Sequence, residues 1–166
     1  MLYCLQKDFP FCCRTGGIPI KAHGEKAILE LLVQTRPEET VELESEQGHV
    51  KMIPFSGTAK GELFQGVIEP CGVDTQVTDA CGVRHMSARY MLTGTDFTGA
   101  HCRIYVENDG WFTNGERPKP WHSVPRFVTN SAALAPILHR SAFIGEGLRQ
   151  EDGLHICFYK IKHTEE

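Results

Sequence analysis

Apolar and polar residues alternate with a period of two from about residue 25 to the end of the chain, in short segments separated by turn residues. The longest such run spans 83–93, and its apolar residues share one face: Met86, Ala88, Tyr90 and Leu92. Successive side chains of a strand point to opposite faces, whereas a helix repeats about every 3.6 residues. Because a helical period is nearly absent, the chain is predicted to be all-β.

Eight or nine strands are predicted from the alternating segments and the glycine-rich turns between them. A meander of this length avoids exposed strand edges by closing on itself, and a barrel of about eight strands encloses side chains or one small ligand. We therefore expect an antiparallel up-and-down β-barrel of about eight or nine strands. A two-sheet β-sandwich is the alternative.

Three segments are predicted to interrupt the strands. Ser56–Gly57 is expected to form a turn between two hairpin strands. The stretch 109–124 contains glycines, prolines and both tryptophans, and is predicted to be a long loop of the kind that covers a binding site. Ser131–Arg140 is expected to form one or two helical turns broken by Pro136.

The length of 166 residues fits one ordinary domain. We expect the barrel to occupy residues 25–166, after an N-terminal extension over residues 1–24. The extension is rich in Cys, Gly and Pro and shows no period. Two roles stay open for it: a tail that packs on the barrel, or a segment that closes one end.

Charge and hydropathy exclude two classes of partner. The net charge of -4 gives no broad positive field, and phosphate backbones are held mainly by clustered Lys and Arg, so no nucleic acid is expected. No stretch approaches the roughly 20 apolar residues of a membrane span, so no membrane partner is expected. The first eight residues lack a basic region followed by an apolar one, and no secretion signal is predicted.

Seven cysteines and eight histidines suggest a metal site, but their spacing does not support one. The chain has no Cys-x-x-Cys, His-x-His or His-Glu-x-x-His pattern, and we expect neither a metal nor a cofactor. The odd number of cysteines is not that of a disulfide scaffold, which favours a reducing, cytoplasmic location.

Six motifs in a fixed order carry a resemblance to a known family: Gly61–Gly66, Pro70–Asp74, Ala88–Leu92, Ile104–Gly110, Pro125–Phe127 and Phe143–Gly147. Over roughly residues 25–162 the chain resembles the domain of unknown function 3237 family, also called uncharacterised protein family 0311. The chain has Thr75 where members usually have Trp. The resemblance implies a small-molecule-binding barrel similar to allene oxide cyclase, lipocalin-like in architecture, with no settled activity.

Three polar residues are the candidate catalytic groups. Asp74 begins a strand after a Pro-Cys-Gly corner, where a carboxylate can act as a base or simply cap a turn. Tyr90 is on the apolar face of its strand, so its hydroxyl is expected inside the barrel, as a proton donor or as a core group with a buried partner. Asn108 falls on the apolar side of its strand and needs hydrogen-bond partners in the protein or in a ligand.

Five further residues are candidates for substrate binding. Trp111 and Trp121 belong to the predicted loop, and Arg126 beside Phe127 is placed to hold an anionic group. Arg89 falls on the face opposite Tyr90. For both arginines, a surface ion pair is the stronger interpretation.

Three functions remain open from the sequence. The first is a cofactor-free isomerase or lyase that acts on a small hydrophobic or phenolic molecule with Asp74, Tyr90 and Asn108. The second is a binding protein without chemistry. The third is a homodimerisation module whose lumen is filled by side chains, with the strand face of His85, Ser87 and Arg89 against a second copy.

Overall fold

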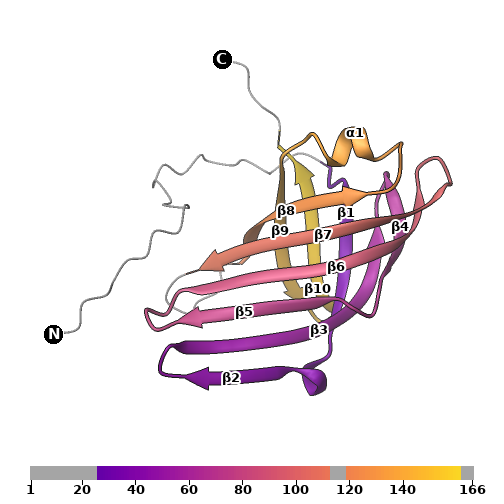
Figure 1. The fold of residues 1–166 in the computed structure, drawn as a ribbon. Helices are drawn as coiled ribbons and strands as arrows, with labels where there is room; N and C mark the ends of the chain where they lie inside the picture. Colours follow the sequence, from indigo (N-terminus) through magenta and orange to yellow (C-terminus); the bar gives the residue numbers. More distant parts are fainter. Residues whose placement is uncertain (1–25, 113–118, 162–166) are drawn as a thin grey trace, which may run out of the picture.

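The computed structural model describes residues 26–112 and 119–161, and these ranges form ten strands, a 3-10 helix and a short α-helix (Figure 1). The strands are β1 (Leu29–Thr35), β2 (Val41–Ser45), β3 (Gly48–Lys60), β4 (Phe64–Ile68), β5 (Val73–Asp79), β6 (Arg84–Asp96), β7 (His101–Phe112), β8 (Trp121–Thr129), β9 (Phe143–Gln150) and β10 (Gly153–Lys160). The 3-10 helix η1 (Pro37–Glu39) follows β1, and α1 (Ala135–Leu138) follows β8. The expected extension over 1–24 lies outside the described residues.

Eight of the strands close into a barrel. Their order is β1-β10-β9-β8-β7-β6-β4-β3, and antiparallel pairing of β1 with β3 joins the two ends of the sheet. Every strand pair is antiparallel, and most neighbours in space are neighbours in sequence. The predicted barrel is confirmed, and the alternative of two packed sheets is not formed.

The two remaining strands extend one end of this barrel. β3 and β6 have 13 residues each, and β4 pairs with one half of them while β5 pairs with the other half (Figure 1). β2 pairs only with β3, and all five of its residues are exposed. At one end of the barrel, the sheet is therefore extended by β2 and β5, which pair with the halves of β3 and β6 that β4 does not reach.

The core consists of the inward faces of the barrel strands. In β6 the predicted alternation is confirmed, because Met86, Tyr90 and Leu92 are buried. Phe127 makes edge-to-face contacts with Phe143 at 5.1 Å and with Phe158 at 5.3 Å between ring centroids. Aromatic pairs of this geometry stabilise a core beyond their buried area alone.

The predicted turn at Ser56–Gly57 is wrong, because β3 runs through both residues. Gly57 instead marks a close approach of two strands. A Cβ atom there would lie 2.1 Å from the carbonyl oxygen of Leu32 on β1, so a side chain would force the strands apart. The glycine that suggested a turn is therefore required by the pairing that closes the barrel.

The long loop predicted over 109–124 is also wrong in extent. β7 continues to Phe112 and pairs with the first residues of β6, and β8 already begins at Trp121. Gly110 and Phe112 are buried and continue the inward alternation of β7. Trp111 therefore lies on β7, and Trp121 is the first residue of β8. Between these strands, residues 113–118 lie outside the described ranges.

The sequence predicted that Pro136 breaks the helical segment, and this is wrong. Pro136 lies in the first turn of α1. The first turn of a helix has no use for a backbone N–H, so proline is tolerated there. α1 has only four residues. In the described part of the chain, no helix is long and apolar enough to cross a membrane.

A buried carboxylate organises the end of the barrel near α1. Asp96 accepts hydrogen bonds from the Ser131 hydroxyl at 2.6 Å, the Thr98 hydroxyl at 2.5 Å and the backbone N–H of Ala100 at 3.2 Å. The Ser131 hydroxyl in turn accepts a hydrogen bond from the backbone N–H of Leu134 at 3.1 Å. These bonds, first those from Ser131 and then those from Thr98, lower the pKa of Asp96 to about 2. The carboxylate therefore joins the β6–β7 turn to the segment that carries α1.

We expect Phe158→Ala to lower the free energy of unfolding by about 3–5 kcal/mol, because it leaves a cavity beside Phe127 in a fully buried part of the core. Urea unfolding followed by circular dichroism measures this change. Phe97→Ala is the control, since Phe97 is 54% exposed, and we expect a much smaller loss. Equal losses for the two variants would contradict the assignment of Phe158 to the core.

The stabilising effect of Asp96 is expected to depend on pH. Its pKa is lower in the folded protein than the usual value of about 3.9, so the stabilisation is fully present above pH ~4 and is lost as the pH falls through about 2. Unfolding of the protein and of Asp96→Asn, measured from pH 7 to pH 2, should show a stability difference that shrinks below pH ~4. Glu38→Gln, at an exposed position of η1, serves as the control for general acid effects.

Candidate functional site

One row of paired residues crosses the barrel wall and brings two of the three candidate catalytic residues together. Asp74 on β5 is opposite Ala88 on β6, and Ala88 is opposite Asn108 on β7. Tyr90 is two residues beyond Ala88 on the same face of β6, opposite Val106. Because side chains two residues apart on a strand share a face, all three point into the barrel.

These three residues line one small cavity inside the barrel, which we call the lumen cavity. Its volume is about 50 Å³, and Trp121, Met86 and Gly110 are also part of its wall. This volume holds a few water molecules. It is smaller than the roughly 150 Å³ of an apolar cavity that binds benzene.

Tyr90 and Asn108 present polar atoms to this cavity without a partner in the described residues. The hydroxyl of Tyr90 and the Oδ1 atom of Asn108 are both buried and make no hydrogen bond within residues 26–112 and 119–161. Burial raises the pKa of the Tyr90 hydroxyl above its usual value of 10, so the group stays protonated and acts as a donor. The ring of Tyr90 is held by an edge-to-face contact with Phe55 at 5.3 Å between centroids.

Asp74 lies at the junction of the lumen cavity with a second, larger hollow. Its carboxylate accepts a hydrogen bond from Nε2 of the buried Gln76 at 2.7 Å, and the residue is half-buried. The larger hollow, which we call the vestibule, has a volume of about 390 Å³. Asp74, Thr35 and Leu154 line both hollows and thus form the neck between them.

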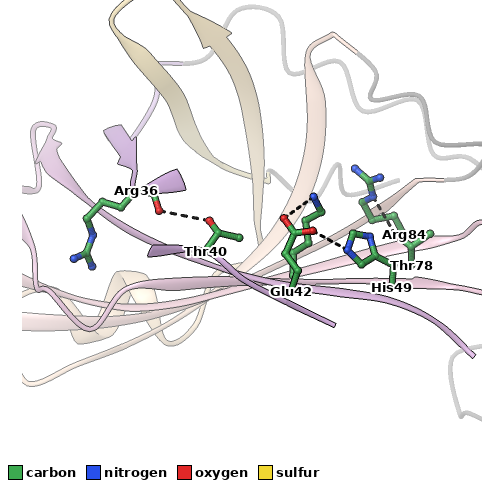
Figure 2. A network of polar contacts seen from close by, with 7 residues as sticks. Arg36, Thr40, Glu42, His49, Thr78 and Arg84 are labelled. Carbon is green, nitrogen blue, oxygen red and sulfur yellow. Dashed lines mark hydrogen bonds and ion pairs between the residues drawn. The ribbon is translucent and has the colours of Figure 1, made fainter. Parts of the chain in front are cut away.

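The vestibule is lined mainly by polar side chains of the extended end of the barrel. Glu42 on β2 accepts hydrogen bonds from Lys51 at 2.9 Å and from the His49 ring at 3.0 Å. Figure 2 shows His49 and Arg84 on the same side of the sheet as Glu42. Contact with Lys51 is the main cause of a lowered pKa of Glu42, which keeps this carboxylate ionised at neutral pH.

Two glycines of β9 make room for side chains of β8, Gly147 for the indole of Trp121 and Gly145 for Ser123. A Cβ at Gly147 would lie 2.2 Å from Cε2 of Trp121, and one at Gly145 would lie 2.4 Å from Oγ of Ser123. Trp121 is opposite Gly147 in the pairing of β8 with β9. The Gly-x-Gly sequence of β9 is therefore a packing feature that places a tryptophan ring in the cavity wall.

The other residues predicted to bind a substrate lie elsewhere in the barrel. Arg89 and Arg126 are on the outer face, where both contact the carboxylate of Glu107, at 3.7 Å and 3.1 Å. Trp111 is also on the outer face and is 53% exposed. Phe127 is part of the aromatic core. Of the five, the structure brings only Trp121 to the cavity with Asp74, Tyr90 and Asn108.

Apart from Asp74, the charged residues of the vestibule were not among the site residues predicted from the sequence. Arg84 shares the inward face of β6 with Met86 and Tyr90, so the alternation already placed it inside the barrel. Arg149 follows Gly145 and Gly147 at the same two-residue spacing on β9, and it is exposed at the end of that strand. The two-residue spacing from inward-facing neighbours could have indicated both arginines, but only the structure shows that the two positions line one opening.

The cavity presents a carboxylate, a phenol hydroxyl and an amide oxygen to one small space. Such a set can accept a proton, donate a hydrogen bond to a substrate oxygen and orient a substrate hydroxyl. Among the described residues, no group of three His, Cys, Asp or Glu side chains is arranged to hold a metal ion.

Comparisons with known proteins give one family and several structures of the same fold. The family described as "Protein of unknown function (DUF3237)" matches residues 26–161. A UPF0311 protein of Clostridium acetobutylicum is 30% identical over 129 residues, which cover 69% of this chain and 78% of that protein.

Three solved structures share the fold. A protein of unknown function from Clostridium acetobutylicum has a TM-score of 0.67 at 24% identity, and the match covers 82% of this chain and 98% of the other. A beta-barrel like protein from Acinetobacter baumannii has a TM-score of 0.65 at 22% identity, covering 82% and 94%. An enzyme from Penicillium herquei has a TM-score of 0.61 at 15% identity, covering 82% and 92%. At these identities the likeness concerns the fold alone.

Gly147→Ala is expected to displace the indole of Trp121 and to lower the free energy of unfolding by about 1–3 kcal/mol, because the added methyl group overlaps the ring. Near-ultraviolet circular dichroism and tryptophan emission report the displacement, and urea unfolding reports the stability. Leu148→Ala, at the adjacent position that is 41% exposed, is the control. An unchanged tryptophan signal in Gly147→Ala would contradict the packing described here.

Proposed function

This chain belongs to the DUF3237 family of proteins of unknown function, and we propose that its barrel binds a small, partly apolar or phenolic molecule and catalyses a cofactor-free isomerisation or elimination. The vestibule receives most of the molecule, since the lumen cavity alone is too small for an aromatic ring. A short group of the molecule reaches past the neck toward Tyr90 and Asn108.

The observation that carries this proposal is the pair of buried polar atoms without a partner. The Tyr90 hydroxyl and Asn108 Oδ1 face one cavity and make no hydrogen bond in the described residues. An unsatisfied buried polar group costs about 1–3 kcal/mol, and such groups are uncommon in folded proteins. A bound molecule with an oxygen for Tyr90 and a hydroxyl for Asn108 removes this cost.

The chemistry follows from the position of Asp74 at the neck. The carboxylate takes a proton from a carbon next to a carbonyl group, and the Tyr90 hydroxyl donates a hydrogen bond to the carbonyl oxygen as negative charge develops there. Asn108 accepts a hydrogen bond from a substrate hydroxyl and fixes its orientation. Return of the proton to another carbon gives an isomer, whereas loss of a leaving group from the adjacent carbon gives an elimination product.

A binding protein without chemistry is the second candidate. A ligand satisfies the same two buried atoms whether or not a proton moves, and Trp121 packs closely against Gly147 in the wall of the cavity. The two candidates differ in the role of Asp74. Only the enzyme requires it to exchange protons with a bound molecule.

The test uses the phenolic ketone 4-(4-hydroxyphenyl)butan-2-one in D₂O, with deuterium incorporation followed by ¹H NMR. We expect the protein to accelerate exchange next to the carbonyl, and Asp74→Asn to lower this rate by about 10²-fold or more. Tyr90→Phe should lower it by about 10²-fold, because the hydrogen bond to the developing oxyanion is lost.

Binding is measured separately in the background Trp111→Phe, which leaves Trp121 as the one tryptophan of the chain. The binding protein would be favoured if the ketone quenches Trp121 saturably while the unchanged protein exchanges deuterium no faster than Asp74→Asn. This result would end the catalytic proposal. Absence of quenching together with absence of exchange would remove phenolic ketones as ligands.

A further inference from the structure

We infer that the vestibule holds a carboxylate group between Arg84 and Arg149, so that the ligand is an amphipathic acid whose other end carries a short polar group toward the lumen cavity. This inference deepens the proposed function and depends on it for the position of the ligand. It assigns the chemical class of the head group, which the residues of the lumen cavity do not define.

The wall of the vestibule carries more positive than negative side chains. Three cationic residues line the hollow, Lys51, Arg84 and Arg149, together with two acidic residues, Glu42 and Asp74. Lys51 is paired with Glu42 at 2.9 Å, and the His49 ring takes the other oxygen of this carboxylate at 3.0 Å. Glu42 is thus already neutralised within β2 and β3, and the two arginines are left to face the hollow.

Arg84 is held in place by neighbours that do not neutralise it. Its Nε atom donates a hydrogen bond to the Thr78 hydroxyl at 3.2 Å, and its guanidinium carbon lies 5.6 Å from the centre of the Phe112 ring. Figure 2 shows Arg84 beside Thr78, and both contacts orient the fork of the guanidinium. Arg84 is only half-exposed. Within the described ranges no carboxylate lies within 4.0 Å of it.

Arg149 enters the same hollow from another strand. It lies at the end of β9, opposite Leu154 of the neck in the pairing with β10. In the part of the chain that the structure describes, Arg149 makes no ion pair with Asp or Glu. The nearby carboxylate of Asp152, in the β9–β10 turn, is paired with His155 at 2.7 Å instead. Two guanidinium groups from separate strands, the half-exposed one of Arg84 and the exposed one of Arg149, therefore line one hollow with no carboxylate partner among residues 26–112 and 119–161.

A planar monoanion fits this arrangement. The wall carries one more positive than negative side chain, which a single carboxylate neutralises. The guanidinium fork matches a carboxylate geometrically and donates two parallel hydrogen bonds to it. The volume of about 390 Å³ lies within the range of small-molecule sites, so the head group and several more atoms fit beside it.

The neck fixes how such an acid lies relative to the proposed chemistry. Asp74, Thr35 and Leu154 belong to both hollows, so a molecule held by the two arginines passes Asp74 before it reaches Tyr90. The carbon atoms beside Asp74 are then those between the carboxylate head group and the short polar group that faces Tyr90 and Asn108. The acidic neck also keeps the carboxylate itself in the vestibule, since like charges repel.

The test is isothermal titration calorimetry with 3-(4-hydroxyphenyl)propanoate and its methyl ester, which differ only in the head group. We expect the acid to bind the protein about tenfold or more tightly than the ester. Arg84→Met and Arg149→Met should each weaken the acid by about tenfold and leave the ester unchanged. Arg84→Lys, which keeps the charge and loses the fork, should give an intermediate loss.

Arg103→Met is the matched control, because Arg103 is an exposed arginine on the outer face of β7, and its removal changes the net charge equally. Circular dichroism of each variant shows whether the barrel is intact, and Arg84→Lys serves if Arg84→Met does not fold. Equal binding of acid and ester, or losses in the two vestibule variants no larger than in Arg103→Met, overturns the inference.

Two further outcomes separate this inference from the proposed function. If the acid binds through both arginines while Asp74→Asn exchanges deuterium as fast as the unchanged protein, the carboxylate site stands and the catalytic proposal fails. If 2-(4-hydroxyphenyl)ethyl phosphate binds more tightly than the acid through the same arginines, the head group is a phosphate and the carboxylate assignment is overturned.

Discussion

Closure of the sheet by the pairing of β1 with β3 is the constraint on which the rest of the structure depends. Six residues of β1, from Glu30 to Thr35, are in register with β3 and leave neither strand with an open edge along this stretch. Only a closed sheet buries the inward side chains of all its strands against one another. The absence of a side chain at Gly57 allows this approach, and the lumen cavity exists because the sheet is closed.

The wall of the barrel could be predicted from the sequence because strand alternation is a local property. The inward positions of Tyr90 and Asn108 follow from their neighbours two residues away, and the structure confirms both. The family resemblance over residues 25–162 is confirmed as well. Pairing between strands is not local, which is why Ser56–Gly57 was predicted to be a turn and why the ends of β7 and β8 were predicted to be part of a loop.

The candidate site could be predicted only in part, for the same reason. The sequence indicated which residues face inward, but not the height at which each side chain stands in the barrel. Arg84 and Arg149 are 65 positions apart and line one hollow through the pairings of several intervening strands. For Arg126 the sequence left two interpretations, an anion-binding group beside Phe127 and, as the stronger one, a surface ion pair. Its guanidinium contacts Glu107 on the outside of the barrel, as the ion-pair interpretation predicts.

β3 and β6 each pair with β4 along one half and with β5 along the other half. The residues that form the core and those that line the vestibule therefore lie mainly on different halves of these strands. One half of each long strand, with β4, is joined to the Asp96 network and the aromatic core, while the other half, with β5, forms the wall of the vestibule. None of the side chains that line the vestibule is one of the buried apolar residues of the core. The same scaffold can therefore carry a different set of recognition groups at this opening without the loss of a core side chain.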